Sequence, residues 1–526
     1  MNINPMTPIT KLLICHNVPL DASYTDTLTF SSNTAQYNYF AGKAKYTYNN
    51  LGPIRLENAI RVPRNADDLY NCNYIAFQNA NFGTKWFYAF ITKIEYVNTN
   101  MSLISFELDV MQTWAFDYTV HPCFVEREHV NDDTIGANIV EEDIGTGPMV
   151  FENRQQAGIS SASNAIIVIC SAINEDSGDA QGGMYGNIYN GCAFFTFPAT
   201  AEGAQQVSEI LKDVTELNRA DSIVSIFMAS DEFFAASGET VPTKNWNIIP
   251  NLTTIDGYTP KNKKLFTYPY HYLFCSNCQG NSAEYRLEFF ETTSLCGFRL
   301  IGETSCTPTV TIVPLNYKYT PESGATDNFN EKMTLEGFPQ CAWTIDSFRA
   351  WLAQNAGNTA ISVLGSAFTA ATALSGPGGI AAMTAGGAMS SGALAGTTAG
   401  LLGVASSLNQ IGVQSSRAGQ AYGSQGSGGM YAYYNLDFFM YEACVTSDYA
   451  KIIDDYFNMY GYAVKETKIP NITGRASWNY VKTMNAKITG SIPFGDIEII
   501  KNNFDKGITF WHGDYVGDYS RSNAIV

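Results

Sequence analysis

The first part of the chain contains short runs of aromatic and β-branched residues separated by polar turns. Residues 11–15 and 27–30 are examples, and this pattern is typical of β-strands. Residues 86–94 are followed by a polar turn and by a second apolar run at 102–110, which predicts a β-hairpin. We therefore expect residues 1–125 to form an N-terminal β domain.

A polar, acidic stretch follows, and we interpret residues 126–150 as an acidic linker or arm. Within it, Glu141, Glu142 and Asp143 form a carboxylate cluster, which is one requirement of an acid site. Because no histidine or metal-ligand spacing accompanies the cluster, we expect these carboxylates to be solvated. We interpret His129 as part of the same polar linker.

The next two parts of the chain differ in their apolar periodicity. Residues 151–250 combine a continuous apolar run at 165–170, expected to be a buried strand, with apolar residues at helical spacing in 202–217. This combination predicts an α/β domain. Residues 251–349 return to short strand-like runs and predict a second β-rich domain.

The pattern changes abruptly after Arg349, because the next charged side chain is Arg417. Residues 350–430 consist largely of Ala, Gly, Ser and Thr with scattered larger apolar residues. Aromatic patterning then resumes, and residues 431–526 are expected to form an α+β part with a helix at 448–460 and strands to the C-terminus. The chain is thus expected to be multi-domain and mainly β with some α+β structure, interrupted by an apolar Gly/Ala-rich insertion.

The uncharged segment is long enough to cross a membrane twice. About 20 helical residues span a bilayer core about 30 Å thick, and residues 355–374 and 380–411 each reach that length. The Gly-Pro-Gly-Gly tip at 376–379 turns the chain but cannot continue a helix. Because a charge at mid-membrane costs about 2.5–3.5 kcal/mol, the lack of charge favours a helical hairpin that enters lipid.

Two groups of residues underlie this hypothesis. The larger apolar side chains of the two arms are the candidate membrane-active residues: Ile361, Leu364, Phe368, Leu374, Ile380, Met383, Met389, Leu394, Leu401, Leu402, Val404, Leu408 and Ile411. The tip and two overlapping GxxxG steps supply the candidate turn and packing residues: Gly376, Pro377, Gly378, Gly379, Gly392, Gly396 and Gly400. GxxxG steps let helices approach closely in a membrane. Since Ala and Gly add little to insertion, a single copy is marginal in lipid, and several packed copies are expected to be stable.

Two other interpretations of this segment stay open on composition. Helices of small residues also pack in soluble cores, and Gly/Ser/Ala stretches also serve as flexible linkers. Residues 419–429 have the composition of such a linker.

The charge balance argues against direct nucleic-acid binding. The chain has 49 acidic and 31 basic residues, a net charge of −18, whereas phosphate binding needs clusters of Lys and Arg. The densest basic run, at 261–264, is short. Only 15% of the residues are charged, which is consistent with a chain that hides much of its surface in an assembly.

The sequence predicts no enzyme, no cofactor and no metal. The eleven cysteines are scattered and no secretory signal is visible, which indicates reduced thiols in the core. Cys275 and Cys278, with Cys296 and Cys306 downstream, have irregular spacing for a zinc site. The five histidines form no ligand pair: His16, His121, His129, His271 and His512. Asp514 and Asp518 beside Trp511 are of the residue types that glycosidases use, but packing and solvated turn roles are favoured for them.

Short motifs along nearly the whole chain resemble the tail knob proteins of φ29-type, short-tailed phages (podoviruses). They are Val-Pro-Leu-Asp at 18–21, Asn-Tyr-Phe at 38–40, the strings at 86–92, 107–114 and 124–130, Tyr-Pro-Tyr at 268–270, and the stretches at 350–355 and 507–512.

This resemblance implies a homo-hexameric, mainly β tube at the distal end of a short tail, with the apolar loop at about residues 355–429. In that family the loops plug the channel and, on ejection, help to form a pore in the host cytoplasmic membrane, through which DNA passes without specific binding. Implied partners are other tail proteins, namely lower collar or tail-tip components, and the implied location is the virion, assembled in the host cytoplasm. The alternatives are a receptor-binding or cell-wall-degrading tail component and a pore-forming protein unrelated to phage.

Overall fold

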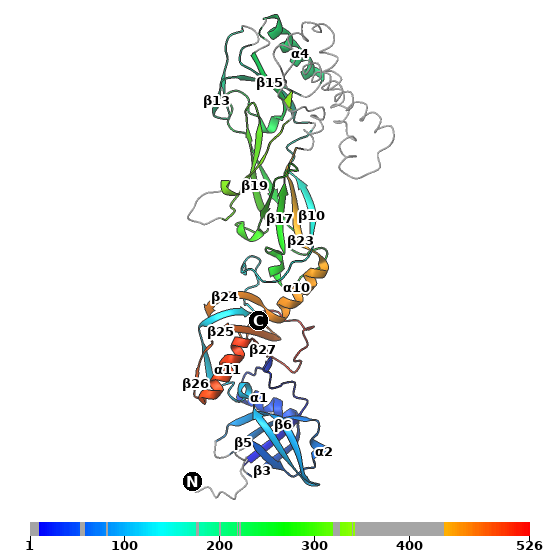
Figure 1. Cartoon of the computed structure of the whole chain (residues 1–526), viewed down its shortest axis with the longest axis vertical. Coiled ribbons are helices and arrows are strands. Elements are labelled where there is room, and N and C mark those ends of the chain that lie inside the picture. Colours follow the sequence, from blue (N-terminus) through cyan, green and yellow to red (C-terminus); the bar gives the residue numbers. More distant parts are fainter. Residues whose placement is uncertain are drawn as a thin grey trace, which may run out of the picture. The chain divides into compact units, whose positions relative to one another are not determined.

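The structure is a computed structural model, and its fold is mainly β (Figure 1). It describes residues 10–52, 58–79, 83–161, 163–174, 178–198, 201–217, 219, 222–318, 327–338, 340–341 and 436–526. The chain forms two compact units. Unit 1 comprises Met1–Gly147, Gly257–Leu265 and Ser447–Val526, and unit 2 comprises Pro148–Asp256 and Phe266–Thr446. The six-part division expected from the sequence stays a prediction.

Unit 1 contains a six-stranded antiparallel sheet. Its strands, in sheet order, are β3 (Ala44–Leu51), β1 (Thr10–His16), β5 (Cys72–Asn79), β6 (Trp86–Asn98), β7 (Met101–Leu108) and β4 (Ala59–Val62). The predicted hairpin is confirmed as β6 and β7, whose pairing extends to Asn98 and Met101. Both faces of the sheet are covered, since the adjacent residues Leu12 and Leu13 of β1 lie in separate hydrophobic clusters.

Helix α1 (Asn33–Gly42) packs on this sheet and was not expected from the sequence. Ser32 caps it by accepting a hydrogen bond from the Ala35 amide at 3.1 Å. The Phe40 ring lies 5.0 Å from Tyr74 and 4.7 Å from Tyr88. Because Phe40 and Gln36 are its only buried residues, the helix has no repeating apolar stripe that a sequence pattern would reveal.

The remainder of unit 1 joins strands from distant parts of the chain. A five-stranded sheet has the order β2 (Asp26–Leu28), β27 (Ile508–Trp511), β25 (Trp478–Met484), β9 (Cys123–Glu128) and β24 (Tyr462–Lys468). β8 (Tyr118–His121) pairs with β26 (Lys487–Gly490), and the short helices are α2 (Ala66–Leu69) and α3 (Val110–Thr113). Trp478 and Trp511 pack in the hydrophobic cluster that also lines the six-stranded sheet.

Two longer helices complete unit 1. The helix expected at 448–460 is confirmed as α10 (Ser447–Tyr460). The expectation that only strands follow it is wrong, because α11 (Phe494–Lys506) lies between β26 and β27. Its buried residues Ile500 and Phe504 are one turn apart, and Gly507, with a φ of 98°, ends the helix.

The described part of unit 2 contains three four-stranded sheets and one hairpin. The first sheet contains β10 (Met149–Gln156), β23 (Phe439–Val445), β17 (His271–Ser276) and β18 (Ser282–Tyr285). The second contains β14 (Ala193–Pro198), β11 (Ala165–Ser171), β15 (Ile223–Ser230) and β22 (Gln340–Cys341). The third contains β16 (Thr243–Ile248), β19 (Cys296–Glu303), β20 (Thr309–Pro314) and β21 (Met333–Leu335). The hairpin is β12 (Gly183–Tyr185) with β13 (Ile188–Asn190).

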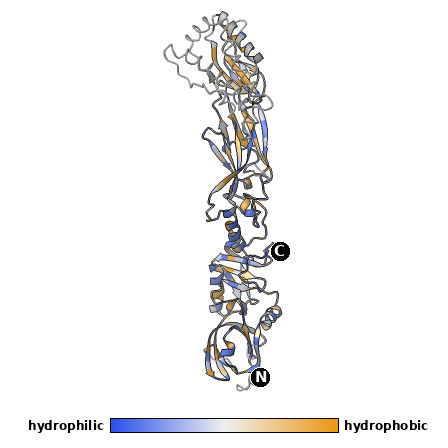
Figure 2. Ribbon diagram, turned by 90° about the vertical axis from the view of Figure 1, so that its right-hand side faces the viewer, coloured by the Kyte–Doolittle hydropathy of each residue, from blue (hydrophilic) through white to orange (hydrophobic). Residues whose placement is uncertain are grey.

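The secondary structure expected at the start of unit 2 is confirmed. β11 is the buried strand expected at 165–170, and α4 (Ala201–Glu216) is the helix expected at 202–217. Short 3-10 helices are η3 (Asp231–Phe233), η4 (Lys263–Phe266), η5 (Leu287–Phe289) and η6 (Phe329–Glu331). Hydrophobic residues run along the strands, as Figure 2 shows, and their inward side chains form the large cluster of unit 2.

A buried polar network holds residues 257–265 within unit 1. The Glu142 carboxylate accepts from the Lys264 ammonium at 2.6 Å, from the Arg127 guanidinium, and from the Ala463 amide at 2.8 Å. The Glu142 side chain has no exposed surface. The expectation that the carboxylates at 141–143 are all solvated is therefore wrong for Glu142, because Arg127 from the same stretch and Lys264 from a distant one fold around it.

His129 is likewise buried and not part of a solvated linker. Its Nδ1 accepts from the Tyr480 amide at 2.7 Å, so its proton lies on Nε2, which donates to the Asn458 carbonyl at 3.2 Å. Burial, helped by the positive charges of Arg475 and Arg127, lowers the pKa of His129 to about 3. The folded protein thus keeps this imidazole neutral.

This neutral histidine predicts a loss of stability in mild acid. Between pH 6.5 and about 3 the unfolded chain binds a proton at His129 and the folded chain does not, so stability falls as the pH falls. Relative to a His129→Gln variant, the wild type should lose about 1.4 kcal/mol of unfolding free energy per pH unit in this range. Urea unfolding at pH 7 and pH 5 measures the difference.

The matched control is His121→Gln, since His121 is half-buried and contacts the Thr489 hydroxyl. This substitution gives the baseline for replacing a histidine elsewhere in unit 1. Equal slopes for wild type and His129→Gln would contradict the buried neutral state.

Candidate functional site at the root of the apolar segment

All of the membrane-active and packing residues predicted from the sequence, from Ile361 to Ile411, lie outside the described residues. No helix among the described residues has the length and apolar character needed to span a bilayer. The structure does describe both places where the chain enters and leaves residues 342–435. These flanking residues, 333–341 and 436–440, are called the root below.

The upstream part of the root continues a sheet of unit 2. After β21, Phe338 packs into the large hydrophobic cluster with 5% of its surface exposed. β22 then pairs with β15 at the edge of the second sheet, with Cys341 opposite Ile226. The upstream part is therefore held by the burial of Phe338 and by the backbone pairing of β22.

The downstream part of the root enters a different sheet. Leu436 and Phe438 are buried, and β23 begins directly after them as an inner strand between β10 and β17. The Ser160 hydroxyl donates to the Leu436 carbonyl. The chain that returns from residue 435 is thus fixed from its first described residue.

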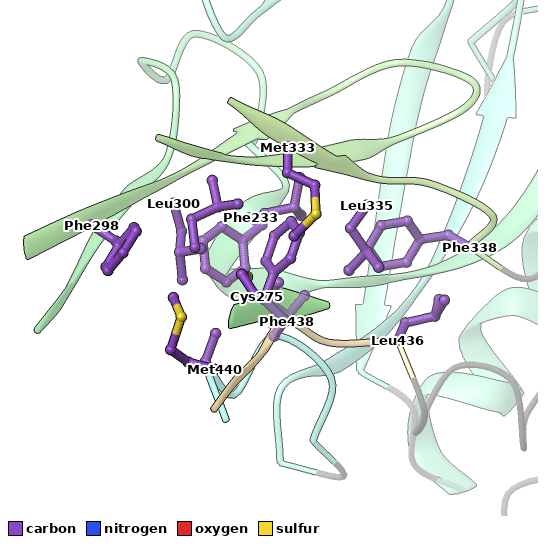
Figure 3. Packing of buried hydrophobic residues seen from close by; sticks show 14 of the residues in the cluster. Phe233, Cys275, Phe298, Leu300, Met333, Leu335, Phe338, Leu436, Phe438 and Met440 are labelled. Atoms are coloured by element: carbon purple, nitrogen blue, oxygen red, sulfur yellow. The ribbon is translucent and has the colours of Figure 1, made fainter. Parts of the chain in front are cut away.

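Both parts of the root pack in one hydrophobic cluster. Figure 3 shows Met333, Leu335 and Phe338 from the upstream part around Phe438, with Leu436 near the same edge. The described residues on the two sides of the segment 342–435 therefore lie in one region of unit 2. Burying each such side chain contributes roughly 1.5–3 kcal/mol, so the root is a stable base for the segment.

Asp437 fixes the downstream part electrostatically. Its carboxylate has no exposed surface and accepts from the Gln156 amide group at 2.7 Å and from the backbone amides of Gly158 and Ile159 at 3.0 and 3.3 Å. Desolvation raises the pKa of Asp437, and these hydrogen bonds oppose the rise. In the sequence, a lone Asp gives no signal of such burial.

The other chemical candidates from the sequence have structural surroundings. Cys275 and Cys296 are fully buried in the unit 2 cluster, whereas Cys278 is exposed. Cys306 lies beside Cys170 instead. Within the described part of the chain, no group of three or more His, Cys, Asp or Glu side chains is arranged to hold a metal.

The carboxylates near the C-terminus make local contacts. Asp514 pairs with Lys43 at 2.7 Å and accepts from the Tyr39 hydroxyl at 2.6 Å. Asp518 accepts from the Ser520 amide and lies 3.3 Å from the Arg521 guanidinium. Trp511 is fully buried. The packing and turn roles favoured from the sequence are consistent with these contacts.

Comparison with solved structures identifies the class of fold. The tail knob protein gp12 of bacteriophage C1 matches with a TM-score of 0.63 and 15% identity, over 98% of this chain and 100% of that one. A family model of the caudoviral major tail protein N-terminus matches residues 8–119, and one of the C-terminal domain of the Bacillus phage phi29 tail knob protein gp9 matches residues 237–524. The chain therefore belongs to the phi29 gp9 tail knob family.

Curated relatives agree over the full length. The tail knob protein gp9 of Bacillus phage B103 is 26% identical over 98% of both chains, and that of phi29 is 24% identical over 98% of both. The resemblance seen in the sequence is thus confirmed. As a member of this family, the chain is a structural component of a phage tail.

Proposed function

We propose that this chain forms the DNA-ejection conduit of a short tail, as a homo-hexamer, and that its apolar segment closes the channel and later enters the host cytoplasmic membrane. The observation that supports the proposal most is the root. A segment that leaves and re-enters unit 2 in one region can move away while the fold beneath it stays intact.

The composition of the segment supports the membrane step. No charged residue occurs between Arg349 and Arg417, so insertion of the two arms carries no charge penalty. Each copy is weakly apolar, and a ring of six places the glycines at 392, 396 and 400 next to equivalent glycines of neighbouring copies. Close helix packing then stabilises the inserted state.

The acidic balance supports the passage of DNA through the lumen. A net charge of −18 gives a wall that offers DNA few phosphate contacts, which favours sliding over binding. The protein acts without catalysis or a cofactor in this proposal. Its partners are other tail components, among them lower collar or tail-tip proteins, and the host membrane.

Dye release from liposomes tests the membrane step with the full-length chain. We expect assembled protein, once triggered by mild heating or acid, to release dye from anionic vesicles. A Gly396→Asp, Leu401→Asp variant should assemble normally and release little dye, because two charges per copy would have to enter the bilayer core. Asn131→Asp, a charge added in unit 1, is the matched control. Undiminished release by the double variant would contradict the proposal.

A further inference from the structure

Three cysteines meet in one cluster of unit 2. Cys170 lies in β11, Cys192 directly precedes β14, and Cys306 lies in the turn between β19 and β20. They pack with Phe194 and Phe227 in one hydrophobic cluster. The Sγ atoms of Cys170 and Cys306 are 3.3 Å apart, and the Cys170 thiol also interacts with Cys192.

We propose that Cys170 and Cys306 form an oxidation site, reduced during assembly and joined as a disulfide in an oxidising medium. Thiols of a protein that is assembled in the cytoplasm are kept reduced there. A tail protein later meets the oxidising exterior as part of the virion. Their contact requires only a small approach of the two sulfurs to reach the bonded distance of about 2.05 Å.

Exposure sets the order of the two exchange steps. Cys306 is half-buried and Cys170 is fully buried, so the Cys306 thiolate attacks a low-molecular-weight disulfide such as oxidised glutathione and releases one glutathione thiol. The Cys170 thiolate then attacks Cys306 Sγ and releases the second. The two protein thiols lose two protons and two electrons, and the small disulfide is reduced to two thiols.

The second step is the slower one. Burial is the main cause that raises the pKa of Cys170, and the neighbouring thiol of Cys306 raises it further. A buried thiol rarely supplies the thiolate that disulfide exchange needs. Closure should therefore accelerate as the pH rises. This delay keeps the pair reduced through assembly.

The bond would tie two sheets of unit 2 together. Cys170 lies on β11 in the sheet that ends at β22, and Cys306 follows β19 of the third sheet. β22 is one end of the root. Oxidation should thus stiffen the base of the apolar segment, whether or not that segment enters membranes.

The test oxidises the reduced full-length protein with glutathione disulfide at pH 7 and pH 8.5. Peptide mapping should find Cys170 linked to Cys306, and formation should be faster at the higher pH. Tm should rise by roughly 5–15 °C, as expected for a bond that closes a long loop. Cys306→Ser should lose both the link and the rise, whereas Cys278→Ser, which removes an exposed thiol of the same unit, should retain them.

Two results would overturn the proposal. One is that both Cys170 and Cys306 of the folded protein can still be alkylated after prolonged oxidation, under conditions in which the denatured protein forms disulfides. The other is a link from Cys170 to Cys192 in place of Cys306. Cys306→Ser replaces a half-buried thiol with a hydroxyl. The folding of this variant is checked by its Tm under reducing conditions, which should equal that of the reduced wild type.

Discussion

Virions that lack residues 357–416 are expected to carry complete tail knobs and to deliver no DNA. The deletion removes the predicted arms and tip but leaves every contact of the root. Because Phe338 and Leu436 pack in the same cluster, the retained residues 342–356 and 417–435 have only a short span to bridge. Every residue of these two ranges can extend the chain by as much as about 3.3–3.6 Å. Particle counts by electron microscopy and plaque titre per particle measure assembly and delivery separately.

A replacement of equal length separates composition from length. If residues 357–416 are exchanged for an equally long Gly/Ser-rich sequence, assembly should persist and delivery should still fail, because such a sequence has no apolar arms to enter lipid. Normal infection by either virion would refute the membrane role. A failure of the deleted chain to form knobs would instead show that the segment is part of the structural core.

The sequence predicted the local elements of this protein better than its buried polar residues. The β6–β7 hairpin and β11 are visible as runs of apolar and aromatic residues, and α4 and α10 because their apolar residues repeat at helix spacing. Helix α1 escaped prediction because it buries only Gln36 and Phe40. α11 was not predicted, although its residues Ile497, Ile500 and Phe504 recur at helical spacing.

Long-range contacts explain what could not be predicted. Glu142 is buried by Lys264 and Arg127, and Asp437 is buried by backbone amides near Gly158. Arg127 lies 15 positions from Glu142, but Lys264 lies 122 positions from it and Gly158 lies 279 positions from Asp437. A pattern of neighbouring residues contains no information on partners as distant as these last two. The root is a product of the same kind of contact, since Phe338 and Leu436 meet only in the folded chain.

Glu142→Gln is expected to be the most damaging single conservative change in unit 1. The amide keeps the shape of the carboxylate but removes the negative charge 2.6 Å from the Lys264 ammonium, whose side chain is 2% exposed. Removing one partner of a buried ion pair costs about 3–5 kcal/mol. Urea unfolding followed by tryptophan fluorescence measures this loss, since Trp478 and Trp511 are buried in the same unit. Asp143→Asn, one residue further along at an exposed position, should change stability little.

The pH dependence of the Glu142→Gln variant tests whether the charge of Lys264 causes its loss of stability. Burial lowers the pKa of Lys264, and Glu142 opposes that shift, so the variant should lower this pKa further. Above the folded pKa the folded chain has released the proton and the unfolded chain still binds it, so stability rises with pH. The deficit of Glu142→Gln should therefore shrink between pH 7 and pH 9, and adding Lys264→Met should recover part of it at pH 7, because both charges are then gone. A deficit that is constant with pH and unaffected by Lys264→Met would mean that Glu142 acts through its hydrogen bond to the Ala463 amide and not through its charge.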